Sequence, residues 1–79
     1  MVGRIVFNTN ELKDYDKGRI SGITYALIYP AKRGLRGWLR RKKTDELMWE
    51  FEATEEQFVN VVTAIDNAYP GMIQRSLLR

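Results

Sequence analysis

A run of basic residues between Ala31 and Thr44 is the feature of this sequence best suited to chemistry. These fourteen residues, AKRGLRGWLRRKKT, hold seven of the thirteen lysines and arginines and no acidic residue. The rest of the chain carries six basic and ten acidic residues, so the net charge of +3 conceals a divided charge distribution. Such a block attracts anions, and it could bind nucleic-acid backbone, a phosphorylated ligand or an acidic protein surface.

The residues expected to contact an anion are the basic side chains of this run and the tryptophan among them. They are Lys32, Arg33, Arg36, Trp38, Arg40, Arg41, Lys42 and Lys43. Each lysine or arginine could neutralise one phosphate, and an indole between two arginines could stack on a base. The alternative is a solvated charge cluster, partly neutralised by Glu46 and Glu50, that binds no ligand.

Patterns for catalysis and metal binding are weak. The chain has no histidine and no cysteine, so the commonest general base and the thiolate zinc sites are missing. Glu50 and Glu52 would share a strand face, but solvated positions explain them better than paired catalytic carboxylates. Asp14 and Asp16 resemble the opening of a calcium loop without its remaining ligands. We therefore expect no enzymatic activity, no metal and no cofactor.

Length and composition predict a single domain over residues 1–79. A chain of this size buries only about 60% of its unfolded surface, so its core is small. The longest apolar run, Ile23 to Tyr29, is far shorter than the ~20 residues that span a bilayer, and the N-terminus lacks the apolar region of a secretion signal. We expect a cytoplasmic protein without a membrane partner.

The basic run is predicted to form a strand rather than a helix. In a helix, Gly34 and Gly37 would each cost about 1 kcal/mol relative to alanine. As a strand, residues 35–40 pair well with residues 46–52 around a five-residue loop, 41–45. The expected pairs are Arg40–Glu46, Trp38–Met48, Arg36–Glu50, Leu39–Leu47, Gly37–Trp49 and Leu35–Phe51. A shift of one residue would reverse every side chain, so the pattern specifies one register.

With residues 20–29, these two strands predict a three-stranded antiparallel meander, 20–29, 35–40 and 46–52. Residues 20–29 are rich in β-branched and aromatic side chains. A helix over residues 54–69 is expected to cover this sheet, because Thr54 and Gln57 can form a capping box before an apolar stripe. The core is expected to contain Tyr25, Leu27, Tyr29, Leu35, Leu39, Leu47, Trp49 and Phe51.

Shorter elements are expected on either side of the meander and its helix. Residues 4–7 and 72–78 predict strands that extend the sheet. Asn10 could cap a single helical turn over residues 11–17, and a plain polar loop is the alternative. The predicted fold class is therefore α+β.

The predicted register places Trp38 beside Met48 on the sheet face that the helix leaves uncovered. A tryptophan and a methionine on an open sheet face indicate a binding patch. The alternative is that the segment containing Leu12 and Tyr15 covers both side chains as part of the core.

These features predict a small basic nucleic-acid-binding protein, accessory or regulatory in role, that contacts phosphates through its basic hairpin tips. The layout is similar in outline to the AP2-type and integrase arm-binding domains, in which a three-stranded sheet backed by one helix enters the major groove. DNA is the preferred ligand, although the sequence does not separate DNA from RNA. An RNA-recognition motif is not supported, because the third strand, ELMWEFE, is acidic and lacks the glycine-aromatic signature.

Two other classes of function stay open. A protein-binding adaptor or inhibitor of a larger complex, of the kind that mobile elements encode, would use Trp38, Met48 and the basic loop. Capture of a nucleotide or another phosphorylated small molecule would use the same basic cluster, although no glycine-rich phosphate loop is present. The divided charge would also let two copies associate as a homodimer.

Overall fold

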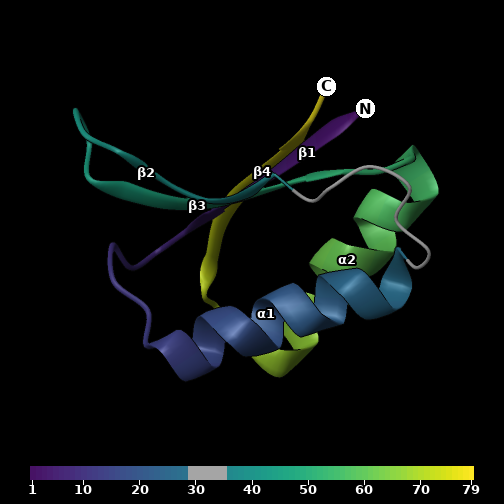
Figure 1. The fold of residues 1–79 in the computed structure, drawn as a ribbon, viewed down its shortest axis with the longest axis horizontal. Coiled ribbons are helices and arrows are strands. Elements are labelled where there is room, and N and C mark those ends of the chain that lie inside the picture. The colour runs from purple at the N-terminus through teal and green to yellow at the C-terminus, as the bar shows by residue number, and fades with distance from the viewer. Residues whose placement is uncertain (29–35) are drawn as a thin grey trace.

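Six elements make up the part of the chain that the computed structural model describes, residues 1–28 and 36–79 (Figure 1). In chain order they are β1 (Val2–Phe7), α1 (Asp14–Leu27), β2 (Gly37–Arg41), β3 (Glu46–Glu52), α2 (Glu55–Ala68) and β4 (Ile73–Leu78). The predicted α+β class is confirmed. The predicted meander with one helix is only roughly matched, because the sheet has four strands and a helix replaces the first predicted strand.

The four strands form one antiparallel sheet in the order β2-β3-β1-β4. Both helices lie on the same side of this sheet, and no described element covers its other side, which we call the open face (Figure 1). An element order of β-α-β-β-α-β is of the ferredoxin-like type. β1 and β4 confirm the two predicted terminal strands, and they lie side by side although the chain separates them widely.

The segment predicted as the first strand of the meander belongs to helix α1 as far as Leu27. Ile20 and Thr24 within the helix and Ile28 at its C-cap recur at every fourth residue and are all buried, so they mark the side of α1 that packs on the sheet. Tyr25 and Leu27, which were expected in the core, are about half exposed. The alternation of β-branched and aromatic residues suggested a strand, but the helical spacing of the apolar residues prevails.

Helix α1 also replaces the single turn predicted over residues 11–17. The helix begins after Lys13 as its N-cap residue and continues through Gly18 without a break. Asn10 does not cap it. Instead, the side-chain amide of Asn10 donates to Asp45 Oδ2 at 2.6 Å, which joins the loop before α1 to the β2–β3 hairpin.

Helix α2 confirms the predicted second helix and the signal for its start. Thr54 Oγ1 accepts the backbone N–H of Gln57 at 3.2 Å, and Gln57 Oε1 accepts the backbone N–H of Thr54 at 2.9 Å. This reciprocal capping box satisfies two donors that the helix cannot pair internally. Phe58, Val61 and Ile65 form the predicted apolar stripe and are buried.

The β2–β3 hairpin is present, but its register differs by one residue from the predicted register. Its loop has four residues, Lys42–Asp45, because Asp45 adopts a left-handed conformation (φ 54°) and Thr44 N–H donates to Arg41 O at 3.3 Å. The observed pairs are Gly37–Glu50, Trp38–Trp49, Leu39–Met48, Arg40–Leu47 and Arg41–Glu46. The predicted pairs within the described residues are therefore wrong by one position, and the β2 side chains exchange faces. The predicted pair Leu35–Phe51 lies outside the described residues.

The core lies between the sheet and the helices. Leu47, Trp49 and Phe51 are buried there, as predicted. The Trp49 indole N–H donates to Thr24 Oγ1 at 2.9 Å, which links the centre of the sheet to α1. Leu39 was also expected in the core, but the register shift leaves it 40% exposed on the open face. Two further predicted core residues, Tyr29 and Leu35, lie outside the described residues.

Candidate nucleic-acid interface

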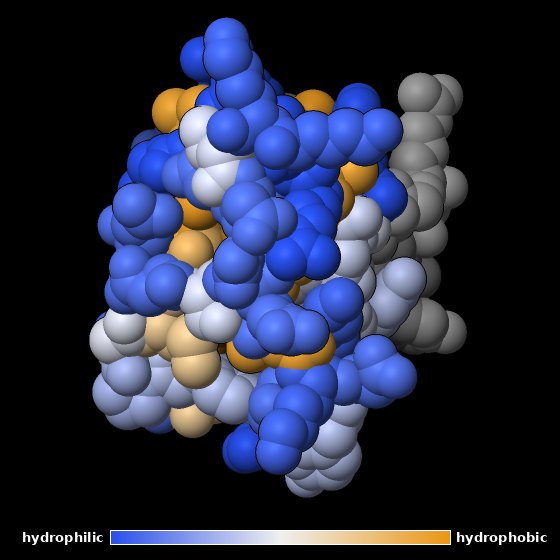
Figure 2. Space-filling model, turned by 90° about the vertical axis from the view of Figure 1, so that its left-hand side faces the viewer, coloured by the Kyte–Doolittle hydropathy of each residue, from blue (hydrophilic) through white to orange (hydrophobic). Residues whose placement is uncertain are grey.

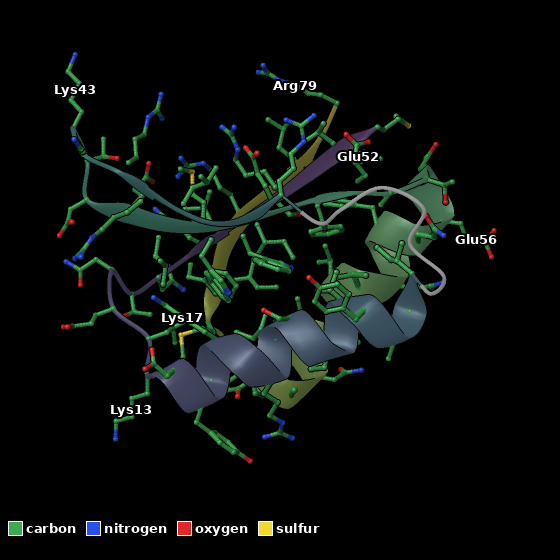
Figure 3. The ribbon with its side chains drawn as sticks, in the orientation of Figure 1. Lys13, Lys17, Lys43, Glu52, Glu56 and Arg79 are labelled. Carbon is green, nitrogen blue, oxygen red and sulfur yellow. The ribbon has the colours of Figure 1, made fainter. Side chains whose placement is uncertain are left out.

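Four of the eight predicted site residues lie together at the end of the β2–β3 hairpin. They are Arg40, Arg41, Lys42 and Lys43, and all four are exposed. Lys43 points away from the helices (Figure 3). Within the described part of the chain, no carboxylate lies at salt-bridge distance from Lys42 or Lys43. Lys32 and Arg33 lie outside the described residues. We call Arg41, Lys42 and Lys43 the basic tip.

The register sends the two arginines at the end of β2 to opposite faces of the sheet. Arg40 lies on the helix side, and its Nε donates to Asp45 Oδ1 at 2.7 Å. This bond and the one from Asn10 lower the pKa of Asp45 below its ordinary value. Arg41 lies on the open face opposite Glu46, with Arg41 Nη1 3.9 Å from Glu46 Oε1. Arg40 is thus engaged within the hairpin, whereas Arg41 makes only a long contact.

Trp38 lies on the helix side of the sheet, so its predicted position beside Met48 on the uncovered face is wrong. Its ring contacts those of Phe7 and Trp49, with centroid distances of 5.6 and 5.1 Å. Its indole N–H donates to Ser21 Oγ on α1 at 3.2 Å. The four-residue loop is the physical reason, because it shifts the register and turns Trp38 inwards. This geometry provides no Trp38/Met48 patch.

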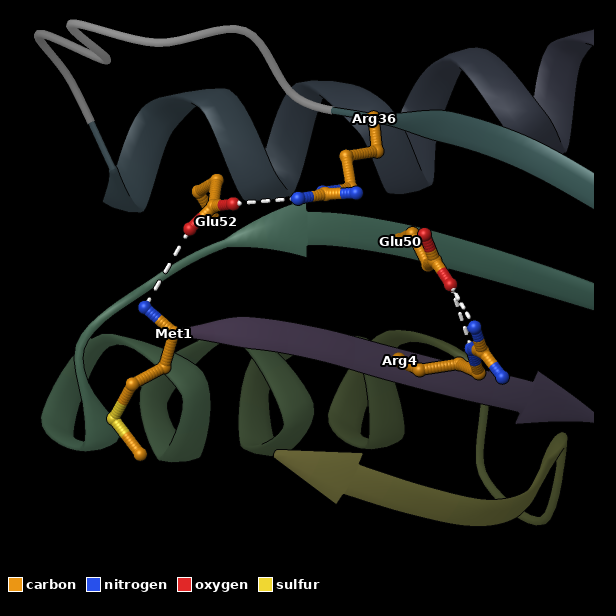
Figure 4. Close-up of polar contacts among 5 residues, drawn as sticks. All are labelled: Met1, Arg4, Arg36, Glu50 and Glu52. Carbon is orange, nitrogen blue, oxygen red and sulfur yellow. Dashed lines mark hydrogen bonds and ion pairs between the residues drawn. The ribbon is translucent and has the colours of Figure 1, made fainter. Parts of the chain in front are cut away.

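Three arginines of the open face are missing from the sequence-based prediction. Arg4 lies on β1, Arg75 on β4, and Arg79 directly follows β4. Arg4 Nε donates to Glu50 Oε2 at 2.7 Å, and its Nη2 bonds the same oxygen (Figure 4). Arg75 donates to both carboxylate oxygens of Glu46, at 2.7 and 3.0 Å. Arg75 and Arg79 are four residues apart, so extended chain over this segment places both side chains on one face of the sheet. This spacing was the signal available in the sequence.

The carboxylates of the open face are bound within the molecule. Glu52 Oε1 accepts a bond from Arg36 Nη2 at 3.1 Å, and its Oε2 lies 3.5 Å from the N-terminal ammonium group (Figure 4). The bond from Arg36 lowers the pKa of Glu52 below its ordinary value. Bonds from Arg75 and then Thr44 lower the pKa of Glu46 from 4.5 to about 2. Both carboxylates are therefore ionised and paired at neutral pH.

Charge is divided between the two layers of the molecule. The open face with the basic tip carries Arg4, Arg36, Arg41, Lys42, Lys43, Arg75 and Arg79 against Glu46, Glu50 and Glu52, a balance of +4. The helices and the loop before α1 carry Lys13, Lys17 and Arg19 against Glu11, Asp14, Asp16, Glu55, Glu56 and Asp66, a balance of −3. The hairpin end of the molecule has a mainly hydrophilic surface, with apolar atoms only in small patches (Figure 2).

No protein-family model matches the chain, and no curated protein or solved structure shows significant similarity to it. Across residues 1–28 and 36–79, no helix is both long enough and apolar enough to cross a membrane. A fold of this type hosts many unrelated activities, so function has to be inferred from the surface itself.

Proposed function

We propose that this protein binds DNA through the basic tip and the adjoining open face, in an accessory or regulatory role. The pairing of the open-face carboxylates is the observation that supports this function best. Glu46, Glu50 and Glu52 are each bonded to an arginine of the sheet, so they do not neutralise Lys42 or Lys43 of the tip. Lys42 and Lys43 pair with no described carboxylate and are free to contact an external phosphate. A cytoplasmic location stays a prediction from the sequence.

The form of the hairpin favours duplex DNA over single strands. The major groove of B-DNA admits a two-stranded β-ribbon. Between Met48, where the pairing of β3 with β1 ends, and the loop, β2 and β3 form such a ribbon, and the loop projects past the helix layer (Figure 1). Lys42 and Lys43 in that loop would reach backbone phosphates on either side of the groove.

The contacts are expected to be made with phosphates rather than with bases. The aromatic side chains of the described strands, Phe7, Trp38, Trp49 and Phe51, all belong to the core side of the sheet. An RNA-recognition motif stacks bases on aromatic side chains of its open sheet face, and no described aromatic side chain is placed there. Binding should therefore depend weakly on sequence and strongly on salt.

Fluorescence anisotropy of labelled duplex DNA, single-stranded DNA and RNA over a range of salt concentrations tests the proposal. Duplex DNA should bind most tightly, with a logarithmic salt slope of about −3 for three or four phosphate contacts. The double variant K42E/K43E should lose most of its affinity. The matched control K13E/R19E reverses two exposed charges, one at the N-cap of α1 and one within the helix, and should bind nearly as well as the wild type.

Equal losses in K42E/K43E and K13E/R19E would show that the tip is not the contact surface. A flat salt response would contradict the phosphate contacts. If no nucleic acid binds at low salt, an acidic protein surface becomes the better candidate partner for the same basic tip.

A further inference from the structure

A hollow of about 300 Å³ lies on the open face, where β3, β1 and β4 run side by side. Four arginines surround it: Arg4, Arg41, Arg75 and Arg79. The apolar part of its lining consists of Val6, Met48 and Leu77. These residues come from distant parts of the chain, and the pairing of β1 with both β3 and β4 brings them together.

Two of the three apolar lining residues are covered by neighbouring side chains, whereas Leu77 is exposed. Val6 and Met48 are only 2% and 6% exposed, although no described element packs on this face. Arg75 lies directly opposite Val6 in the register, so its hydrocarbon stem can cover apolar surface while its guanidinium group stays at the rim. Charges at such a rim interact more strongly than in open water because the surface beneath them is apolar.

Two of the four guanidinium groups are held in place by carboxylates. Glu50 binds Arg4, and Glu46 binds Arg75 through two hydrogen bonds. A guanidinium group has five N–H donors, and these bonds use two on each arginine. The glutamates therefore orient Arg4 and Arg75 and leave their remaining donors for another acceptor.

The other two arginines make no short bond to a described carboxylate. Arg41 Nη1 is 3.9 Å from Glu46 Oε1, at the edge of a salt-bridge contact. The backbone of Arg79 is fixed, because its N–H and C=O bond the backbone of Val2 at 2.9 and 2.6 Å. The Arg79 side chain extends from the sheet on the side away from the helices (Figure 3). Both guanidinium groups can therefore move onto a ligand in the hollow.

We infer that this hollow binds one phosphate group, with Arg41 and Arg79 as its direct contacts and Arg4 and Arg75 as oriented partners. Guanidinium groups match phosphate through paired hydrogen bonds. Four arginines against two glutamates leave an excess of two positive charges, which suits a phosphomonoester of about −1.5 to −2 charges. The phosphate belongs either to a nucleic-acid backbone or to a free phosphomonoester such as a mononucleotide.

This site is separable from the proposed DNA contact at the basic tip. Of the three residues of the basic tip, only Arg41 also lines the hollow. Inorganic phosphate probes the hollow without requiring a polyanion, whereas duplex DNA probes the tip. Loss of one activity with retention of the other therefore identifies which of the two proposals fails.

The test is an NMR titration of the full chain with inorganic phosphate, with chloride at the same ionic strength as the reference anion. Backbone amides of Val6, Met48 and Leu77 should shift saturably with phosphate and not with chloride. The double variant R41Q/R79Q should lower phosphate affinity about tenfold, since each change removes a charge-assisted bond. These two arginines are suitable because neither neutralises a buried carboxylate, whereas Arg4→Gln would leave Glu50 unpaired.

The matched control K13Q/R19Q removes one positive charge at the N-cap of α1 and one within the helix, and it should change phosphate affinity less than about twofold. Shifts that follow ionic strength alone would overturn the inference. So would equal phosphate affinities for R41Q/R79Q and K13Q/R19Q.

Adenosine 5′-monophosphate and short duplex DNA distinguish the two sources of the phosphate. Shifts of the hollow amides with the nucleotide but not with the duplex identify a free phosphomonoester as the ligand. Shifts of these amides with the duplex, lost in R41Q/R79Q, identify a backbone phosphate. If neither molecule moves the hollow amides, the inference is wrong even if inorganic phosphate does.

Discussion

Trp38 lies directly opposite Trp49 across the β2–β3 hairpin, and their ring centroids are 5.1 Å apart on the helix side of the sheet. The next residue along β2, Leu39, lies opposite Met48 on the open face. The register therefore assigns one of two adjacent apolar side chains to the core and the other to the surface. This assignment decides which face of the hairpin can bind a partner.

Adjacent alanine substitutions test the register. Trp38→Ala should lower the free energy of unfolding by about 3 kcal/mol, because it removes contacts with Phe7 and Trp49 and a bond to Ser21. Leu39→Ala should cost less than about 1 kcal/mol, because Leu39 is 40% exposed. Urea unfolding of both variants measures the difference.

The predicted register with a five-residue loop would give the reverse order of stabilities. A larger loss for Leu39→Ala than for Trp38→Ala would therefore contradict the observed pairing. Trp38→Phe serves as a control, since it keeps an aromatic ring against Phe7 and should recover much of the lost stability.

The buried hydrogen bond between Trp49 and Thr24 yields a second prediction. Thr24 is fully buried, and its Oγ1 accepts the indole N–H at 2.9 Å. Thr24→Val keeps the volume but leaves that N–H unpaired, so it should cost about 1–3 kcal/mol in urea unfolding. In a Trp49→Phe background the same change should cost much less, because no donor is left. Equal costs in the two backgrounds would argue against the bond.

Two glycines should respond to alanine with opposite signs. A Cβ at Gly3 would lie 2.5 Å from Phe58 Cδ1 and 3.1 Å from Phe51 Cε2, so Gly3→Ala should destabilise the fold by about 1–3 kcal/mol. Gly18 is exposed within α1 and has no atom within 4 Å of an added Cβ. Gly18→Ala should therefore stabilise the protein by up to about 1 kcal/mol. Thermal unfolding monitored by circular dichroism compares them, and a stabilising Gly3→Ala would contradict the close packing of β1 on α2.

Helix α2 was predictable because its determinants are local. The Thr54–Gln57 capping box and the apolar spacing after it lie within one segment. Helix α1 was not predictable in the same way. Its sequence satisfies a helical spacing through Ile20, Thr24 and Ile28 and also a strand-like alternation. The choice depends on tertiary structure, because β1 and β4 complete the sheet and residues 14–27 pack on its helix side instead of pairing with β2.

The hairpin register could not be decided from pairing chemistry. The predicted register gives charge-paired or apolar rows throughout, whereas the observed register pairs Arg40 with Leu47 and Gly37 with Glu50. The loop therefore outweighs the pairing chemistry and decides the register. Asp45 adopts a left-handed conformation, which aspartate tolerates, and this closes a four-residue loop. Gly37 has a positive φ of 96° and no atom within 4 Å of an added Cβ, so it does not lie beneath Trp49.

The candidate site was predictable only where it is contiguous in sequence. Lys42 and Lys43 follow from the charge run, and the structure places them at the hairpin tip. Arg4, Arg75 and Arg79 belong to the two ends of the chain. They meet the hairpin only because β1 pairs with both β3 and β4. Sheet order, rather than any local motif, assembles the open face.

The Glu46–Arg75 pair predicts how stability depends on acid. The folded pKa of Glu46 is about 2, below its ordinary value of 4.5, because Arg75 and then Thr44 bond the carboxylate. A lowered pKa means that this stabilisation is fully present above about pH 4.5 and is lost as pH falls towards about 2. Glu46→Gln should therefore flatten the loss of stability across this window, measured as the urea midpoint at successive pH values.

The control Glu11→Gln replaces an exposed loop carboxylate that no described cation pairs with, and its profile should follow the wild type. A Glu46→Gln profile as steep as that of the wild type would show that the pair does not govern the acid response.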